Sequence, residues 1–235
     1  MELRLLDIEG IHGVTLARDK LDLSAAFLIP YLLQLALSAN FKVVLVLVQE
    51  SSSHYQQALR KLGVNLADCI STSQVSTVSI AASLCAEGGL ESVIQKVTQL
   101  CQETSAPQRK GVCVFVDSLT ALYGLTSSPQ EWQAFLHYCQ ALACVTKGHY
   151  LCVLVAHEDV KDDAHWIRRL RHAAQTEIEV RALESGASQD VAGQVLLTTR
   201  KASGTMSREV SASNPLQEPQ KMFFKLGAGD IRFFQ

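Results

Sequence analysis

The sequence lacks Cys-x-x-Cys pairs and apolar runs long enough to cross a membrane. Its seven cysteines (69, 85, 101, 113, 139, 144 and 152) form an odd set, which favours buried free thiols over disulfides or a zinc site. The most membrane-like stretch, residues 23–37, is shorter than the ~20 residues that span a bilayer and is interrupted by Ser24, Pro30 and Gln34. We therefore expect no metal, no membrane contact and a buried helix in this stretch.

The sequence also lacks an excess of charge of either sign. A formal net charge of -2 excludes a protein that binds nucleic acid through its overall charge, so any such contact has to come from a local patch or from partners. The N-terminus, "MELRLLDIEG", contains acidic residues and no cleavage pattern, which argues against a secretory signal. We expect a cytoplasmic protein and leave a nuclear location open.

Strand-like and helical segments alternate along most of the chain. This alternation predicts a single α/β domain with a mostly parallel central sheet flanked by helices. We expect strands at 13–17, 41–50, 112–117 and 150–159, and helices at 24–39, 54–62 and 91–103. Pro30 should kink the first helix or delay its start. Residues 69–83 carry no pattern from which we predict an element.

A further helix is marked by strong local signals. Ser128 and Glu131 have capping-box spacing, Pro129 takes the first helical position, and Gly148 closes the far end. Apolar residues recur at helical spacing and predict one buried face: Trp132, Phe135, Leu136, Cys139, Leu142 and Ala143.

The C-terminal part alternates more than the rest. The segments "TEIEVRAL", "GQVLLTTRK" and "KMFFKLGAGDIRFFQ" predict antiparallel strands that finish the sheet, with "GAGD" as the last hairpin turn. Residues 202–220 are rich in Ser, Pro and Glu and predict a long flexible loop.

One apolar segment, "VCVFVDSLTALYG" at residues 112–124, runs into Asp117 as the Mg²⁺-binding strand of a P-loop NTPase does. Such a carboxylate has a catalytic role only if an upstream loop holds a nucleotide. Two interpretations follow. As a degenerate Walker B relic, Asp117 caps a neighbouring helix or holds the loop after the strand; as a functional residue, it binds a metal without the usual phosphates.

Glycine is missing where the upstream loop would have to be. A phosphate cradle reads G-x-x-x-x-G-K-[S/T], because glycines let backbone N–H groups close round the phosphates. The corresponding segment reads "ARDKLDLS", and no glycine lies between Gly13 and Gly63. Lys20 is followed by Leu, and Asp19 and Asp22 would repel a triphosphate. We predict that this loop binds no nucleotide, that the chain needs no cofactor, and that Asp117 is a relic.

Four motifs in order carry a family resemblance: "SHYQQALRKLGVNLADC", "FLHYCQAL", "VLVAHEDV" and "ALESGASQDVAGQV". Together they resemble the family of the sixth subunit of the Elongator complex, and the resemblance covers most of the chain. It implies a RecA-like domain over residues 1–235 without a functional P-loop. It also implies a heterohexameric ring with Elongator subunits four and five, which binds tRNA and supports wobble-uridine modification while catalytic Elongator subunits perform the chemistry.

Several polar residues at expected strand ends are candidate contact sites. His54 and Tyr55 follow the second strand and are candidates for contact with a neighbouring subunit or RNA; alternatively, Tyr55 packs at a helix start with its hydroxyl at the surface. His157, Glu158 and Asp159 are successive, so they cannot all face one ion from a strand, and we expect a hydrogen-bonded loop there.

The segment "KDDAHWIRRLRHAAQ", residues 161–175, has the strongest basic character. If it is helical, Trp166 and Leu170 share one face. The RNA-binding candidates are Arg168, Arg169, Arg171 and His172, with Trp166 as a base-stacking residue if it is exposed. The alternative is an ordinary amphipathic helix whose Trp is core and whose arginines pair with acids.

The sequence therefore favours a non-catalytic ring subunit that is not an enzyme. The rival hypotheses are an active NTPase of the recombinase or clock-protein type, with Asp117 on Mg²⁺, and a RecA-like scaffold unrelated to tRNA. The missing glycines and the missing Lys-Ser/Thr pair argue against the NTPase.

Overall fold

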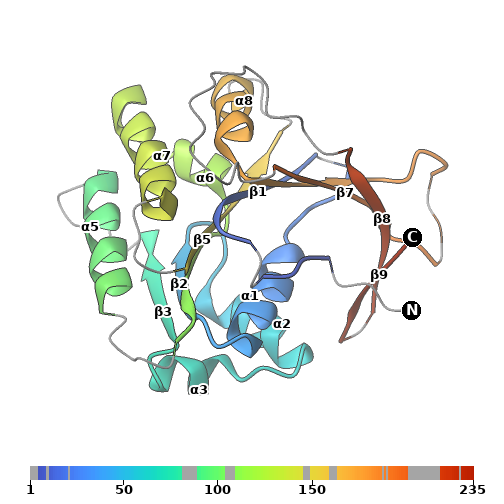
Figure 1. Ribbon diagram of the computed structural model, residues 1–235, viewed down its shortest axis with the longest axis horizontal. Coiled ribbons are helices and arrows are strands. Elements are labelled where there is room, and N and C mark those ends of the chain that lie inside the picture. Colours follow the sequence, from blue (N-terminus) through green and yellow to red (C-terminus); the bar gives the residue numbers. More distant parts are fainter. Residues whose placement is uncertain are drawn as a thin grey trace, which may run out of the picture.

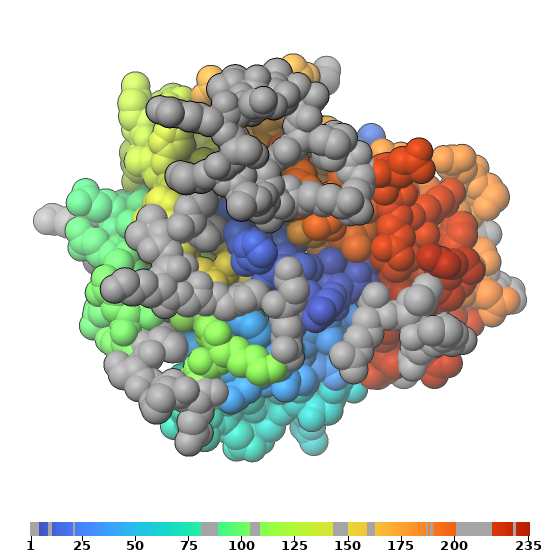
Figure 2. All heavy atoms as spheres, viewed as in Figure 1, coloured from blue at the N-terminus to red at the C-terminus, as the bar shows by residue number. Residues whose placement is uncertain are grey.

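A computed structural model describes residues 5–8, 11–20, 22–80, 89–103, 109–144, 149–158, 163–186, 188, 190–200, 218–227 and 229–235. Within them, one sheet runs in the strand order β3-β2-β4-β5-β1-β6-β7-β8-β9, with helices on both of its faces (Figure 1). Figure 2 shows the C-terminal strands gathered on one side of the molecule and α5 and α7 on the other. The α/β architecture predicted from the sequence is confirmed.

The first six strands in spatial order are parallel. They comprise β3 (Val75–Ser79), β2 (Lys42–Leu47), β4 (Gly111–Val116), β5 (His149–His157), β1 (Gly13–Asp19) and β6 (Thr176–Arg181). Strands β2, β4 and β5 are apolar along almost their whole length because helices cover them on both sides. The expected strand positions are confirmed to within a few residues.

Antiparallel pairing finishes the sheet at its C-terminal end. β7 (Gly193–Thr199), β8 (Gln220–Leu226) and β9 (Ile231–Phe234) pair in sequence, and the Gly227 N–H donates to the Asp230 carbonyl at 2.8 Å in the expected last turn. The segment that begins at Thr176 differs from the prediction, because β6 is antiparallel to β7 but parallel to β1. Of the expected loop 202–220, residues 202–217 lie outside the described part of the chain.

Helices cover the two faces in separate groups. α1 (Leu28–Ser38), α2 (Ser52–Lys61) and α3 (Leu66–Ser71) lie on one face, whereas α5 (Gly89–Gln102), α6 (Leu119–Tyr123), α7 (Pro129–Cys144) and α8 (Ala164–Ala173) lie on the other (Figure 1). α1 begins later than residue 24, with Pro30 in its first turn, where a backbone N–H needs no helical acceptor. None of the described helices has the length and apolar character to cross a membrane.

Two elements, α3 (Leu66–Ser71) and β3, lie in or beside the segment 69–83, for which no element is predicted from the sequence. α3 is a six-residue helix whose N-cap, Asn65, accepts from the Ala67 N–H, and β3 follows it directly. α3 is too short to show an apolar periodicity, so its capping residue was the available signal. Strand β3 is stabilised mainly by its pairing with β2, which is a long-range contact.

Two hydrophobic cores fill the spaces between the sheet and its helical layers. Alternate residues of β2 divide between them: Val43 and Leu45 face the α1–α2 layer, and Val44 and Val46 face the α5–α8 layer. Five cysteines, Cys69, Cys101, Cys113, Cys139 and Cys152, are free thiols, and no metal-binding group of side chains occurs among the described residues. Burial raises the pKa of the Cys101 thiol to about 12.

The capping signals before α7 are confirmed, with one addition. The Ser128 hydroxyl accepts the Glu131 N–H at 3.2 Å, while the Glu131 carboxylate accepts the N–H groups of Ser127 at 2.9 Å and Leu90 at 2.6 Å. Glu131 therefore joins the start of α7 to the start of α5. Trp132, Phe135, Leu136 and Cys139 are buried as expected, Leu142 is half-buried, and Gly148 lies outside the described residues.

We expect Glu131→Ala to lower the free energy of unfolding by about 1–3 kcal/mol, because the buried Leu90 N–H would lose its acceptor. Urea unfolding followed by circular dichroism measures this loss. Gln130→Ala, at an exposed position of the same turn, is the matched control and should change stability by less than about 0.5 kcal/mol. Equal losses in the two variants would contradict the proposed link between α5 and α7.

Candidate functional site

Charged side chains gather where the parallel strands end. Asp19 ends β1, Asp117 follows β4, His157 ends β5 and Glu158 follows it. The carboxyl ends of parallel strands are where α/β sheets place their ligands. This end of the sheet is therefore the candidate site, and the contacts of each carboxylate decide what it can bind.

The Asp117 carboxylate is fully occupied by donors from its own chain. Its Oδ1 accepts the N–H groups of Val48 at 2.8 Å and Gln49 at 3.3 Å, and its Oδ2 accepts the Glu50 N–H at 3.0 Å and the Tyr55 hydroxyl at 3.4 Å. Burial raises the pKa of Asp117, although these hydrogen bonds oppose the rise. Four donors account for the lone pairs of one carboxylate. This geometry supports the relic interpretation, with the modification that Asp117 holds the loop after β2.

Tyr55 and His54, at the start of α2, differ in their exposure to solvent. Tyr55 is buried, and both its burial and the nearby Asp117 charge raise its pKa. The idea that its hydroxyl reaches the surface is wrong, because the hydroxyl donates to Asp117 inside the protein. His54 is exposed, and its Nδ1 lies 3.4 Å from a Glu50 carboxylate oxygen. Of the two candidates, His54 is the one accessible to a partner.

The loop after β1 is closed by side-chain contacts of its own. Asp19, which is buried, accepts the Ala25 N–H through Oδ2 at 2.5 Å and contacts the His157 Nδ1 through Oδ1 at 2.5 Å. Lys20 and Leu23 form a β-bridge that draws the loop into a tight turn. In a phosphate cradle, a phosphate oxygen would accept the hydrogen bond of such a backbone N–H. Here the Asp19 carboxylate accepts the Ala25 N–H instead. The predicted absence of a nucleotide cradle agrees with this geometry.

A buried ionic network lies beside this loop. The Arg18 guanidinium, whose side chain is 5% exposed, donates to the carboxylates of Glu158, Glu177 and Glu179. Arg171 and Arg181 pair with Glu177 and Glu179 from outside, and the network lines a cavity of about 430 Å³. Removing one partner of a buried ion pair is strongly destabilising. Arg18, which is buried and has three partners, therefore has a structural role.

Sequence reasoning did not find the network. The available signal was "TEIEV", in which Glu177 and Glu179 are two residues apart and therefore share one face of a strand in an apolar sheet. Charges at such positions need partners of opposite sign.

The hydrogen-bonded loop predicted at His157, Glu158 and Asp159 begins one residue later, because His157 is the last residue of β5 and Glu158 follows it in a turn. The Thr120 hydroxyl accepts the His157 N–H at 3.0 Å, and the Glu158 N–H donates to the Asp19 carbonyl at 2.9 Å. Asp159 lies outside the described residues. His157 and Glu158 turn to different partners, Asp19 and Arg18, which agrees with the argument that these successive residues do not ligate one ion.

The basic segment forms α8, and its RNA-binding candidates lie in different environments. Trp166 is 2% exposed and belongs to the core, so it is not available to stack on a base. Arg171 pairs with Glu177 at 2.8 Å. Arg168, Arg169 and His172 are exposed on the remaining surface of the helix.

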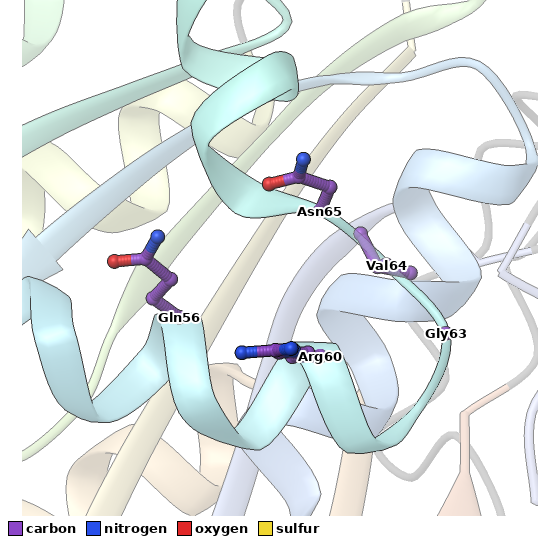
Figure 3. A pocket seen from close by; sticks show the side chains of 5 residues that line it. All are labelled: Gln56, Arg60, Gly63, Val64 and Asn65. Atoms are coloured by element: carbon purple, nitrogen blue, oxygen red, sulfur yellow. The ribbon is translucent and has the colours of Figure 1, made fainter.

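Another described cavity lies away from the strand ends. It has a volume of about 490 Å³ and is lined by Gln56, Arg60, Gly63, Val64 and Asn65 at the end of α2 and the turn to α3 (Figure 3). Arg60 is the charged residue among the lining residues that the structure describes. These described residues include no carboxylate, histidine or nucleophile, so they offer no catalytic pair.

Comparison with known proteins identifies the family. The family described as Elongation complex protein 6 matches residues 79–217. The chain belongs to this family. Elongator complex protein 6 of Xenopus laevis is 25% identical over 232 residues, covering 89% of this chain and 85% of that protein. The human Elongator complex protein 6 is 25% identical over 202 residues, covering 76% of each.

Solved structures show the fold of this family member. A KaiC-like protein from the archaeon Pyrococcus horikoshii superposes with a TM-score of 0.66 at 11% identity, covering 95% of this chain and 89% of that protein. The fold is therefore RecA-like, as the family resemblance implied.

Asp117→Ala should lower the free energy of unfolding by more than about 2 kcal/mol, because three backbone N–H groups and the Tyr55 hydroxyl lose their acceptor. Tyr55→Phe removes one donor and should cost about 0.5–1.5 kcal/mol. Chemical denaturation measures both, and the presence of Mg²⁺ should change neither value. A Mg²⁺-dependent stabilisation of the wild-type chain that Asp117→Ala abolishes would restore the metal-binding interpretation.

Proposed function

We propose that the chain is a non-catalytic subunit of the Elongator complex. In this proposal it assembles with Elongator subunits four and five into a heterohexameric ring, and the ring supports tRNA binding and wobble-uridine modification by the catalytic Elongator subunits. Family membership supports the assignment to the complex. The ring and tRNA roles rest on what the family resemblance implies, and the site geometry is compatible with them.

The observation that carries the non-catalytic role is the self-contained site at the strand ends. The Asp117 carboxylate is used by four donors, and the Asp19 carboxylate is used by Ala25 and His157. A nucleotide would place further negative charge beside Asp19, which is buried. The domain over residues 1–235 therefore acts as a scaffold with a RecA-like fold and no functional P-loop. The rival NTPase gains no support from these contacts.

The tRNA surface in this proposal lies on the exposed side of α8. Arg168 and His172 are exposed, and no described residue forms a hydrogen bond or ion pair with either side chain. Arginine suits phosphate because its planar guanidinium donates in pairs. A net charge of -2 makes an isolated chain a weak polyanion binder, so we infer that strong RNA binding needs the assembled ring.

Two measurements test the assignment to a non-catalytic subunit. Isothermal titration calorimetry of the lone chain with ATP and Mg²⁺ should show no saturable heat, because the donors of the site are already satisfied. Affinity purification of the tagged chain from cells should recover Elongator subunits in stoichiometric amounts. Micromolar ATP binding would favour the NTPase, and an assembly without Elongator subunits would favour a scaffold unrelated to tRNA.

A charge variant tests the tRNA surface. Arg168→Ala combined with His172→Ala should weaken tRNA binding by the assembled ring and reduce the slope of log affinity against log salt by about 1, the loss of one phosphate contact. Arg60→Ala is the matched control, since Arg60 is exposed on the opposite helical layer. An unchanged affinity and salt slope in the double variant would exclude this part of α8 from the RNA surface.

A further inference from the structure

Two phenyl rings lie on the outer face of the C-terminal strands, the side of β8 and β9 that faces away from α1. The doubled phenylalanines of "KMFFKL" and "IRFF" divide between the two sides of the sheet. Phe224 and Phe233 are buried in the core on the α1 side. Phe223 and Phe234 therefore lie on the outer face, where both are half-buried, and their rings stack with centroids 6.2 Å apart and planes 29° apart.

The helices on this side of the sheet lie over its parallel part. α7 contacts β5 and β1, and α8 contacts β1. Figure 1 shows β8 and β9 to one side of these helices. The rings of Phe223 and Phe234 accordingly keep part of their surface accessible to solvent. Accessible aromatic rings on a sheet are the surface on which unpaired bases stack.

Cations surround the two rings. Lys221 and Lys225 lie two residues before and two residues after Phe223 on β8, and Arg232 lies two residues before Phe234 on β9. Because alternate residues of a strand share a face, all three cations lie on the outer face, and all three are exposed. The Lys221 ammonium lies 5.3 Å from the centroid of the Phe223 ring. The outer face thus combines ring surfaces with positive charge.

The cations and the rings form adjacent rows. Lys225 is the cross-strand partner of Arg232, and Phe223 is the cross-strand partner of Phe234. Two residues along a strand separate the rows, which is about 7 Å. This spacing is comparable to that between the phosphate and the base of one nucleotide. A nucleotide whose base stacks on a ring therefore brings its phosphate within reach of a cation.

Two of these cations also have acidic partners. The Lys225 Nζ lies 2.9 Å from an Asp190 carboxylate oxygen, and the Arg232 Nε lies 2.5 Å from an Asp230 carboxylate oxygen. The side chains of Asp190 and Asp230 are 87% and 44% exposed, so both are surface pairs, which contribute little to stability. A phosphate oxygen can replace either carboxylate as the acceptor.

The row of rings continues across the sheet to a further cation. The cross-strand partner of Phe223 on β7 is Gln194, and that of Gln194 on β6 is Arg181. Arg181 lines the cavity of about 430 Å³, and Glu179 holds its guanidinium while 43% of the side chain stays exposed. Two strand spacings, about 10 Å, separate Arg181 from Phe223. An extended single strand that crosses from β8 to β6 brings a second phosphate to this guanidinium.

We infer that the outer face of β6 to β9 binds single-stranded RNA, with unpaired bases stacked on the Phe223–Phe234 pair and phosphates bound by the surrounding cations. The inference rests on the proposed role in tRNA binding and adds to it the recognition of unpaired nucleotides. It uses none of the residues of the proposed α8 surface. RNA fits this face better than an acidic protein segment does, because carboxylates pair with the cations but make no use of the rings.

Binding of fluorescein-labelled hexauridylate to the full-length chain at low salt, followed by fluorescence polarisation, tests the stacking. The wild type should bind saturably. Phe223→Leu combined with Phe234→Leu should weaken binding at least about tenfold with the salt dependence unchanged, because an apolar side chain remains but the flat ring is lost. Phe223→Tyr combined with Phe234→Tyr is the matched control, which keeps both rings and should bind within about threefold of the wild type.

A charge variant and two further probes separate stacking from attraction between charges. Lys221→Ala should reduce the slope of log affinity against log salt by about 0.7, the loss of one phosphate contact with a single strand. Lys61→Ala removes an exposed lysine on the opposite helical layer and should leave the slope unchanged. An abasic hexamer of the same charge should bind at least about tenfold more weakly than hexauridylate. Hexaglutamate should not displace the RNA at equal concentration.

Three results would overturn the inference: no binding of hexauridylate, wild-type affinity in the double leucine variant, or equal binding by the abasic hexamer or hexaglutamate. None of them bears on the proposed function, which is tested by tRNA binding to the assembled ring. A wild-type ring that binds no tRNA would contradict the proposed function, whatever the lone chain does with hexauridylate.

Discussion

The backbone N–H groups that follow β1 and β2 at the carboxyl end of the sheet need acceptors, and two side-chain carboxylates supply them. Asp117 accepts from Val48, Gln49 and Glu50, and Asp19 accepts from Ala25. In a nucleotide-binding protein of this architecture, phosphate oxygens and a metal would share this region. Here the chain satisfies these donors with its own anions, so the loops keep their positions without a ligand.

This constraint explains why charge is concentrated beside β1. Asp19 is buried next to His157, and Arg18 in the preceding position draws in the glutamates of β6 and the end of β5. Burying so many charged groups is costly unless each has a partner. Arg171 pairs with Glu177 and Arg181 pairs with Glu179, which supplies further positive charge to the buried carboxylates. Part of the basic character of the C-terminal half is therefore structural.

The sequence predicted what depends on local pattern and missed what depends on long-range pairing. The apolar strands, the capped start of α7 and the missing phosphate cradle could be read from neighbouring residues. β3 and the parallel pairing of β6 could not, because they are decided by strands distant in sequence. For the same reason the sequence favours a relic interpretation of Asp117, whereas the β2 loop that it holds and the burial of the Tyr55 hydroxyl are visible only in three dimensions.

The basic residues of α8 lie in different environments because burial of its apolar residues orients the helix. Its apolar residues Trp166, Ile167 and Leu170 fix the rotation of the helix against the sheet. That rotation places Arg171 over Glu177, Arg169 beside α7 and Arg168 on the exposed surface. A cluster that reads as one basic patch in the sequence thus becomes three different environments. The carboxylates at the strand ends are engaged by the chain's own groups, so the proposed contacts with partners lie on outer surfaces such as this one.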